Sequence, residues 1–259
     1  MSVCISLKDT VTALGDIFMP RYCIVCGQPL ALHERHLCIR CLADLPMTYF
    51  SYQSRNQMAD RFNDFIQSDL DADPSLPSEE YVFATSLFFY RSSTGYRKIT
   101  QRLKYHADFA AGRFFSEMLG EQMTTVDHFK DIDVVIPVPL HWSRRWSRGY
   151  NQAEVIAEVL GKALGAKVRK DILLRPGRTR TQTKLSIEEK SRNVSKAFAV
   201  RKGYARRLAS GKERQPRHVL LIDDVFTTGA TMHACFRALR EVFPKGTRIS
   251  LATLAAVGM

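Results

Sequence analysis

The strongest chemical signal in the chain is an apolar run that ends in two adjacent acids, at residues 219–231 (VLLIDDVFTTGAT). The pattern predicts a buried strand that ends in two carboxylates and is followed by a threonine-rich turn and a helix. Carboxylates at the carboxyl end of a strand could bind ribose hydroxyls or Mg²⁺, and the free N–H groups of the helix N-terminus could bind a phosphate. The candidate residues are Asp223, Asp224, Thr227, Thr228, Gly229, Ala230 and Thr231.

This run differs from two other phosphate-binding patterns. A Walker loop would require GxxxxGK[ST] and a dinucleotide fingerprint would require GxGxxG, and neither is present in the sequence. The alternative interpretation is a chance pair of acids before a threonine-rich helix start. Strand, acids, turn and helix nevertheless occur in the order that phosphate binding requires.

Four cysteines form two CxxC pairs, CIVC and CIRC, with eleven residues between them. Such pairs suit tetrahedral Zn²⁺, because each pair supplies two thiolates from a tight turn. The alternatives are disulfides, which a reducing compartment disfavours, and buried free thiols, which would not need paired spacing. We expect a structural zinc site that excludes His33, His36, Cys4 and Cys235. Its expected ligands are Cys23, Cys26, Cys38 and Cys41.

A third cluster, at residues 142–150, combines arginines with large aromatic residues. Guanidinium groups bind phosphates and flat aromatic faces stack on bases, so the cluster favours contact with nucleic acid or phosphate. In the alternative interpretation the tryptophans pack inside and the arginines line a ligand cleft. Asn151 could cap the helix that follows. The cluster consists of Trp142, Arg144, Arg145, Trp146, Arg148 and Tyr150.

The net charge of +12 is concentrated in one part of the chain. Residues 130–218 contain 22 Lys and Arg against 8 Asp and Glu, a net +14, and the rest of the chain is slightly acidic. Such a concentration favours phosphate-bearing partners, although a solvated lysine-rich face is the alternative. Within this part, residues 201–217 have seven basic residues and little to bury, which predicts an exposed basic loop.

The elements that would position these groups alternate between strand and helix. Aromatic and β-branched residues predict a strand at 81–90, and helical spacing follows at 96–105. Short apolar strands interleaved with amphipathic helices require a mostly parallel sheet that is covered on both faces. Further strands are expected at 133–139, 173–174, 218–224 and 247–256, and further helices at about 151–164 and 229–242.

Length and composition fit a globular α/β protein of one or two domains: 259 residues, 45% hydrophobic and 25% charged. Residues 60–80 hold seven acids and two prolines, which predicts an acidic loop or linker. We therefore expect a zinc module at 1–59, a linker at 60–80 and a larger domain at 81–259. No stretch approaches the roughly 18 apolar residues of a membrane span, and no signal peptide is evident, so a cytoplasmic location is expected.

The acidic run at 219–231 resembles the 5-phosphoribosyl-1-pyrophosphate (PRPP) binding motif of type I phosphoribosyltransferases. The segment LKYHAD at 103–108 matches their pyrophosphate loop, which implies that Lys104 supplies charge there. The polar segment 177–190 corresponds to the loop that closes over the reaction in those enzymes. The runs at 135–157 and 179–198, together with the double CxxC, resemble the ComF family; their matching residues include Arg148, Gly149, Tyr150, Asn151, Gln152, Gln182, Leu185, Arg192 and Asn193.

The resemblance implies a type I phosphoribosyltransferase-like fold with an N-terminal zinc module. It also implies a PRPP-binding protein that supports natural transformation on the cytoplasmic side of DNA uptake. Mg²⁺ would accompany PRPP, and single-stranded DNA and proteins of the competence machinery would be the partners, with Arg144, Arg145 and Arg192 as candidate phosphate contacts. The alternative is an active phosphoribosyltransferase with Asp223, Asp224 and Lys104 in catalytic roles and an unidentified acceptor.

Overall fold

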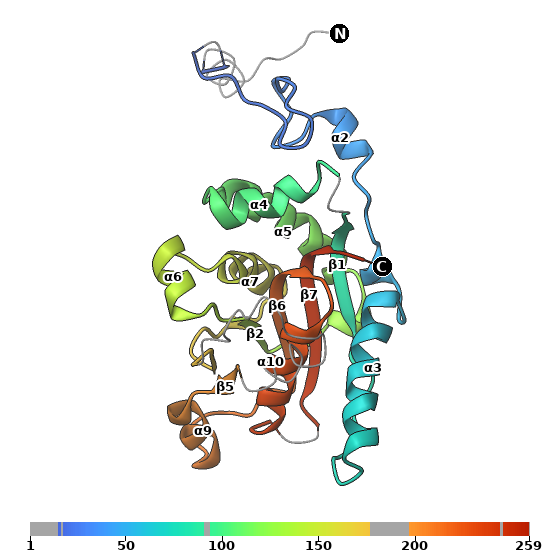
Figure 1. The fold of residues 1–259 in the computed structure, drawn as a ribbon, viewed down its shortest axis with the longest axis vertical. Helices are drawn as coiled ribbons and strands as arrows, with labels where there is room; N and C mark the ends of the chain where they lie inside the picture. The colour runs from blue at the N-terminus through green and yellow to red at the C-terminus, as the bar shows by residue number, and fades with distance from the viewer. Residues whose placement is uncertain (1–14, 17, 91–93, 177–196, 244–245, 259) are drawn as a thin grey trace, which may run out of the picture.

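The computed structural model describes residues 15–16, 18–90, 94–176, 197–243 and 246–258. A five-stranded, fully parallel sheet forms its centre, in the order β1-β7-β6-β2-β3 (Figure 1). Its strands are β1 (Ala84–Phe89), β2 (Val134–Pro137), β3 (Lys167–Val168), β6 (His218–Phe226) and β7 (Arg248–Ala256). The predicted α/β class with a mostly parallel, helix-covered sheet is confirmed.

Two layers of helices cover the sheet, as its apolar strands require. One face carries α3 (Gln57–Ala72) and α10 (Ala230–Arg240), and the other carries α4 (Arg97–Tyr105), α5 (Phe109–Thr124) and α7 (Gln152–Ala163). Strand β6 serves both layers, because alternate residues point to opposite faces. Val219 and Leu221 lie in the core beneath α3 and α10, whereas Leu220 and Ile222 lie in the core beneath α5 and α7.

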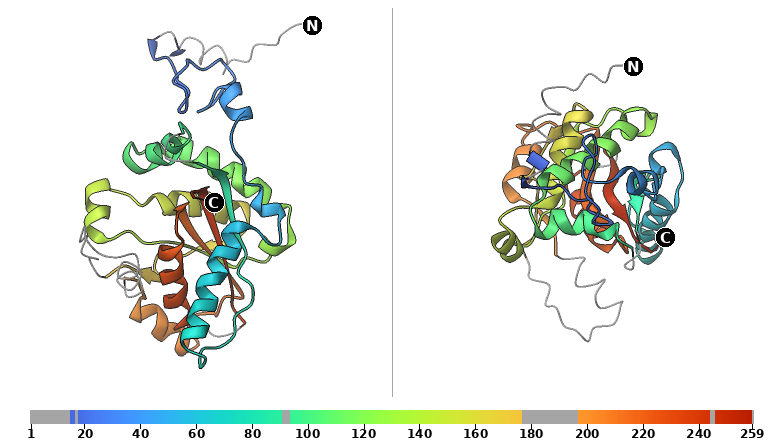
Figure 2. Two further views of the ribbon diagram at one scale, coloured as in Figure 1. Left: turned by 45° about the vertical axis from the view of Figure 1, so that its right-hand side comes forward. Right: turned by 90° about the horizontal axis from the view of Figure 1, so that it is seen from above.

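The smaller elements lie around this sandwich. They are α2 (Ile39–Ala43), α6 (Trp142–Arg148), α9 (Lys202–Ala209) and the short 3₁₀ turns Phe50–Tyr52 and Asp127–Phe129. The predicted strand at 173–174 is β4 (Leu173–Leu174), which does not join the parallel sheet but pairs antiparallel with β5 (Ala199–Val200). The cysteine-bearing segment lies beyond α4 and α5, at the opposite end of the molecule from α9 (Figures 1 and 2).

The acidic segment 60–80 is not a loop along its whole length, since most of it belongs to the 16-residue helix α3. The Asn56 side chain caps this helix by accepting the Ala59 N–H at 2.9 Å. The buried face of α3 contains Met58, Phe62 and Ile66, and Phe62 packs edge-on against Phe236 of α10. The acids lie mostly on the outer face of α3, and for this reason the composition of a surface helix was interpreted as that of a linker.

The basic segment 201–217 is likewise not a plain loop, because it contains α9. Tyr204 anchors the helix and is only 2% exposed. The guanidinium carbons of Arg169 and Arg207 lie 5.0 Å and 5.8 Å from the centre of its ring. One buried aromatic residue among seven basic ones was too weak a signal to predict this helix.

No helix in the described part of the chain has the length and apolar character needed to cross a bilayer.

Candidate functional site

The two acids of β6 lie near the carboxyl end of the strand but on opposite faces of the sheet, as successive strand residues must. Asp224 points toward α4, where its Oδ2 is 2.7 Å from Nζ of Lys104. Asp223 points toward α10, and its Oδ1 accepts the Asp224 backbone N–H at 2.9 Å. Asp224 is only 3% exposed. Acids at the end of a strand would be expected to be exposed and to bury little, but Asp224 is buried.

The charges around this pair are partly removed from water. Burial alone would lower the pKa of Lys104, but the charge and hydrogen bond of Asp224, together with the charge of Asp223, raise it above its ordinary value. Burial and the charge of Asp224 raise the pKa of Asp223 to about 8. The site thus holds a lysine that stays protonated at neutral pH, next to a carboxyl group that gives up its proton reluctantly.

The threonine-rich turn leads from β6 into α10 as predicted. Thr227 and Thr228 are exposed, and Gly229 has φ +89° at the helix N-cap. The Ala230 N–H donates to Thr228 Oγ1 at 3.4 Å, and Thr231 follows in the first turn. A Cβ on Gly229 would lie 2.8 Å from Phe226 Cζ, so both backbone conformation and packing require glycine here.

Because Gly229 offers no capping side chain and the Ala230 N–H makes only a long bond of 3.4 Å to Thr228 Oγ1, backbone N–H groups at the start of the eleven-residue helix are available to a ligand. The helix dipole favours an anion at this position. The turn, the carboxylates and Lys104 therefore meet at one end of β6. Their arrangement can bind a phosphorylated, hydroxyl-bearing ligand.

The arginine and tryptophan cluster occupies the short helix α6. Trp142 and Trp146 are 67% and 88% exposed, so the tryptophans do not pack inside as the alternative interpretation held. Arg144 and Arg145 are exposed, and Arg145 Nη1 is 2.9 Å from Glu154 Oε1. Arg148 donates to Gln152 Oε1 at 3.2 Å, and its guanidinium carbon lies 5.1 Å from the centre of the Tyr105 ring. Arg192 lies outside the described residues, as do Gln182, Leu185 and Asn193.

Tyr150 has a different role from the stacking that its position in the cluster suggested. Its hydroxyl donates to the Leu103 carbonyl at 2.5 Å and accepts the Ala107 N–H at 3.1 Å. Its ring meets Phe109 edge-on, with 4.8 Å between the ring centres. Tyr150 thus holds the turn that follows Lys104, in which Ala107 has φ +50°. Asn151 caps α7 as predicted, accepting the Ala153 N–H at 3.1 Å.

Arg175, which follows β4, is a residue of this region that the sequence did not single out. Its guanidinium carbon lies 5.0 Å from the centre of the Phe198 ring, and the side chain is half-buried. Burial and the charge of Arg144 lower the pKa of Arg175, while the charge of Asp223 opposes this change. It is therefore a second cation near the acids, besides Lys104. A single arginine after two leucines carries no motif that could have revealed it.

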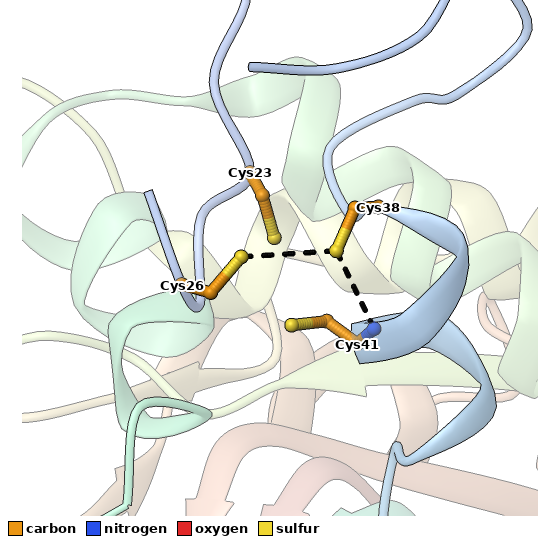
Figure 3. A group of neighbouring side chains, drawn as sticks. All are labelled: Cys23, Cys26, Cys38 and Cys41. Carbon is orange, nitrogen blue, oxygen red and sulfur yellow. Dashed lines mark hydrogen bonds between the residues drawn. The ribbon is translucent and has the colours of Figure 1, made fainter. Parts of the chain in front are cut away.

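The four predicted cysteine ligands form one cluster, drawn in Figure 3. Their sulfur atoms all lie within 4.8 Å of one another; Cys26 and Cys38 Sγ are 3.7 Å apart, and the Cys41 N–H points at Cys38 Sγ from 3.5 Å. Burial opposes ionisation of Cys23, yet nearby N–H groups and Cys26 lower its pKa to about 6. Four convergent sulfurs fit a tetrahedral metal such as Zn²⁺, and the group includes neither His33 nor His36.

No protein-family model matches the chain. The chain is 32% identical over 148 residues to Competence protein F of Haemophilus influenzae. The match covers 56% of this chain and 61% of that protein, so the chain spans less than two thirds of the relative's length.

Proposed function

We propose that this chain is a ComF-type protein that binds PRPP at the carboxyl end of β6 and acts in natural transformation in the cytoplasm. One observation carries the ligand assignment: the acids, the glycine turn and the helix start follow one another at the carboxyl end of β6, where Lys104 Nζ lies 2.7 Å from Asp224 Oδ2. The likeness to Competence protein F supports the biological role.

Within this proposal the parts of PRPP are divided among neighbouring elements. The 5-phosphate would lie on the N–H groups of Thr227–Thr231 at the start of α10, with the threonine hydroxyls as further donors. Asp223 would accept ribose hydroxyls, while Lys104 and Arg148 would face the pyrophosphate. Mg²⁺ would arrive with the pyrophosphate and neutralise its charge, because Asp224 is already paired with Lys104.

We further propose that Zn²⁺ occupies the cysteine cluster and that α6 contacts single-stranded DNA. The zinc would be structural, since four thiolates complete its coordination. Trp142 and Trp146 offer exposed rings for base stacking, and Arg144 and Arg145 offer charge beside them. Proteins of the competence machinery are the expected partners. The division into a module at 1–59, a segment at 60–80 and a domain at 81–259 stays a prediction.

Calorimetric titration of the zinc-loaded protein with PRPP and Mg²⁺ tests the ligand. We expect wild type to bind and Asp223→Ala, which removes the acceptor oxygens, to lose about tenfold in affinity, the effect of one hydrogen bond. The matched control is Asp127→Ala, because the Asp127 side chain is 91% exposed near the other end of the sheet. A folded wild-type protein that gives no heat of binding would refute PRPP as the ligand. Pyrophosphate release measured in the same samples distinguishes transfer from binding.

A further inference from the structure

The segment 95–98, which leads into the first turn of α4, is attached to the cysteine cluster by three contacts. The Tyr96 hydroxyl donates to the backbone carbonyl of Cys41 at 3.2 Å. Lys98 Nζ donates to the carbonyl of Val25, the residue between Cys23 and Cys26, at 2.9 Å. A Cβ on Gly95 would lie 2.9 Å from Val25 Cγ1 and 3.0 Å from Val25 O, so the two backbones approach closely. All three contacts reach metal-ligand residues or their immediate neighbours.

The last turn of the same helix carries Lys104, which is paired with Asp224 at the candidate PRPP site. Eight residues separate Tyr96 from Lys104, which is about 12 Å along a helix axis. Tyr150 holds this end of α4 through its hydrogen bond to the Leu103 carbonyl. Helix α4 therefore joins the two sites directly, with a fixed contact at each end.

Apolar packing makes this connection stiff. Ile99 and Leu103 are buried in the same core cluster as Cys23, Ile24 and Cys41. Well-packed cores move between discrete arrangements and deform little, so displacement of one end of a short helix is transmitted to the other. If the cysteine knuckles lose their fixed geometry, the first turn of α4 loses its anchors, and Lys104 loses its fixed position.

We propose that metal occupancy of the four-cysteine cluster sets the position of Lys104 through helix α4, and thereby regulates anion binding at the β6–α10 site. The inference rests on the proposed function for its ligand. It makes the cysteine segment a control element for the ligand site in addition to its structural role. Because coupling is reciprocal, bound PRPP must tighten zinc binding by the same factor.

Hydrogen exchange tests the helix without reference to any ligand. Zinc-loaded protein and protein depleted of zinc under reducing conditions are compared, with peptides from β6 and β7 as the internal standard for an intact sheet. We expect faster exchange across α4 in the depleted protein and unchanged exchange in β6 and β7. Unchanged exchange in α4 would overturn the inference.

Calorimetry with PRPP and Mg²⁺ then measures the coupling. We expect zinc depletion to weaken PRPP affinity by about tenfold, within the range usual for coupled sites. Equal affinity with and without zinc would overturn the inference and leave PRPP binding intact. If zinc-loaded wild type does not bind PRPP at all, the proposed function fails, and the exchange of α4 alone decides whether the helix responds to the metal.

Variants at the contact between α4 and the cysteine cluster distinguish coupling between the two sites from simple loss of the metal. Gly95→Ala should push Val25 away from the start of α4, and Lys98→Met removes the hydrogen bond to the Val25 carbonyl. Both variants should still bind zinc. Their affinity for PRPP should be weaker than that of wild type and should depend less on whether zinc is bound. The matched controls are Gly203→Ala, whose Cβ would meet nothing closer than 3.8 Å, and Lys130→Met, a surface lysine paired with Asp127. Wild-type affinity in zinc-loaded Gly95→Ala, with the zinc response retained, would contradict the proposal.

Discussion

At the scale of single residues, the two adjacent acids of β6 have different surroundings and hence different roles. Asp224 is buried and paired with Lys104, so its carboxylate positions a cation. Asp223 is half-buried on the other face and keeps one oxygen for a ligand, since the other accepts the Asp224 N–H. The DD pattern assigned both acids to the same ligand chemistry; the alternation of side chains along a strand gives them different surroundings.

Neutralising the two acids one at a time should separate these roles. Asp224→Asn leaves the Lys104 ammonium largely buried without its partner, and we expect the free energy of unfolding to fall by about 2 kcal/mol. Asp223→Asn keeps the acceptor oxygen and removes a carboxyl group whose ionisation is opposed by burial, so it should not lower the free energy of unfolding at pH 7. Urea unfolding monitored by circular dichroism measures both values. Equal losses in the two variants would show that the pairing with Lys104 does not distinguish them.

The stability of the protein should also depend on pH through Asp223. Its pKa is raised from 3.8 to about 8 in the folded protein, by burial first and by Asp224 second. The folded state therefore retains a proton that the unfolded state releases, and stability is lost as pH rises from about 4 toward 8. Asp223→Asn cannot titrate, so its stability relative to wild type should increase over this window. A constant difference between pH 4 and pH 8 would argue against the raised pKa.

At the scale of elements, helices α3 and α9 were missed because their composition hides a narrow buried face. Strand β6, helix α7 and helix α10 follow clear apolar patterns and were predicted within a few residues. Helices α3 and α9 bury a few residues each beneath acidic or basic surfaces, and charge dominated their pattern. In these two helices most residues face water and determine the composition, whereas the few buried residues determine where the helix packs.

Helix α3 gives this argument a direct test. Phe62 is fully buried and lies 5.6 Å from Phe236, ring centre to ring centre. Phe62→Ala should lower the free energy of unfolding by about 3–5 kcal/mol, the usual effect of removing a buried phenylalanine. An acidic linker would tolerate the change with almost no effect. Chemical denaturation beside the exposed control Leu76→Ala, at 41% exposure, distinguishes the two interpretations.

Helix α6 is the element on which the proposed binding of single-stranded DNA depends. Base stacking on an aromatic side chain contributes about 1–3 kcal/mol per base, so Trp146→Ala should weaken oligonucleotide binding by about 5- to 150-fold. The ring is 88% exposed, and its removal should leave thermal stability unchanged. Fluorescence anisotropy with a labelled oligothymidylate measures the affinity. Tyr52→Phe, on a tyrosine that is 53% exposed and remote in sequence, serves as the control.

At the scale of the whole molecule, the sequence localised the sites better than it described the path between them. The cysteine pairs and the acidic run predicted two clusters, because the residues of each lie close together in the sequence at a recognisable spacing. The connection through α4 depends on Tyr96, Lys98 and Gly95, which belong to no motif and become meaningful only when the chain is folded. Long-range contacts of this kind leave no local pattern.

The uneven charge of the chain leads to the last prediction. If the positive charge of α6 attracts single-stranded DNA, the affinity for DNA should fall steeply as the salt concentration rises. Neutralisation of about three phosphates predicts that the affinity falls by about tenfold or more between 50 and 200 mM salt. Arg144→Glu should weaken binding and flatten this salt dependence, because it removes a phosphate contact beside the exposed tryptophans. Arg206→Glu on α9 changes the net charge equally from an exposed position outside α6. Equal effects of the two reversals would mean that DNA responds to total charge, and that α6 is not a binding site.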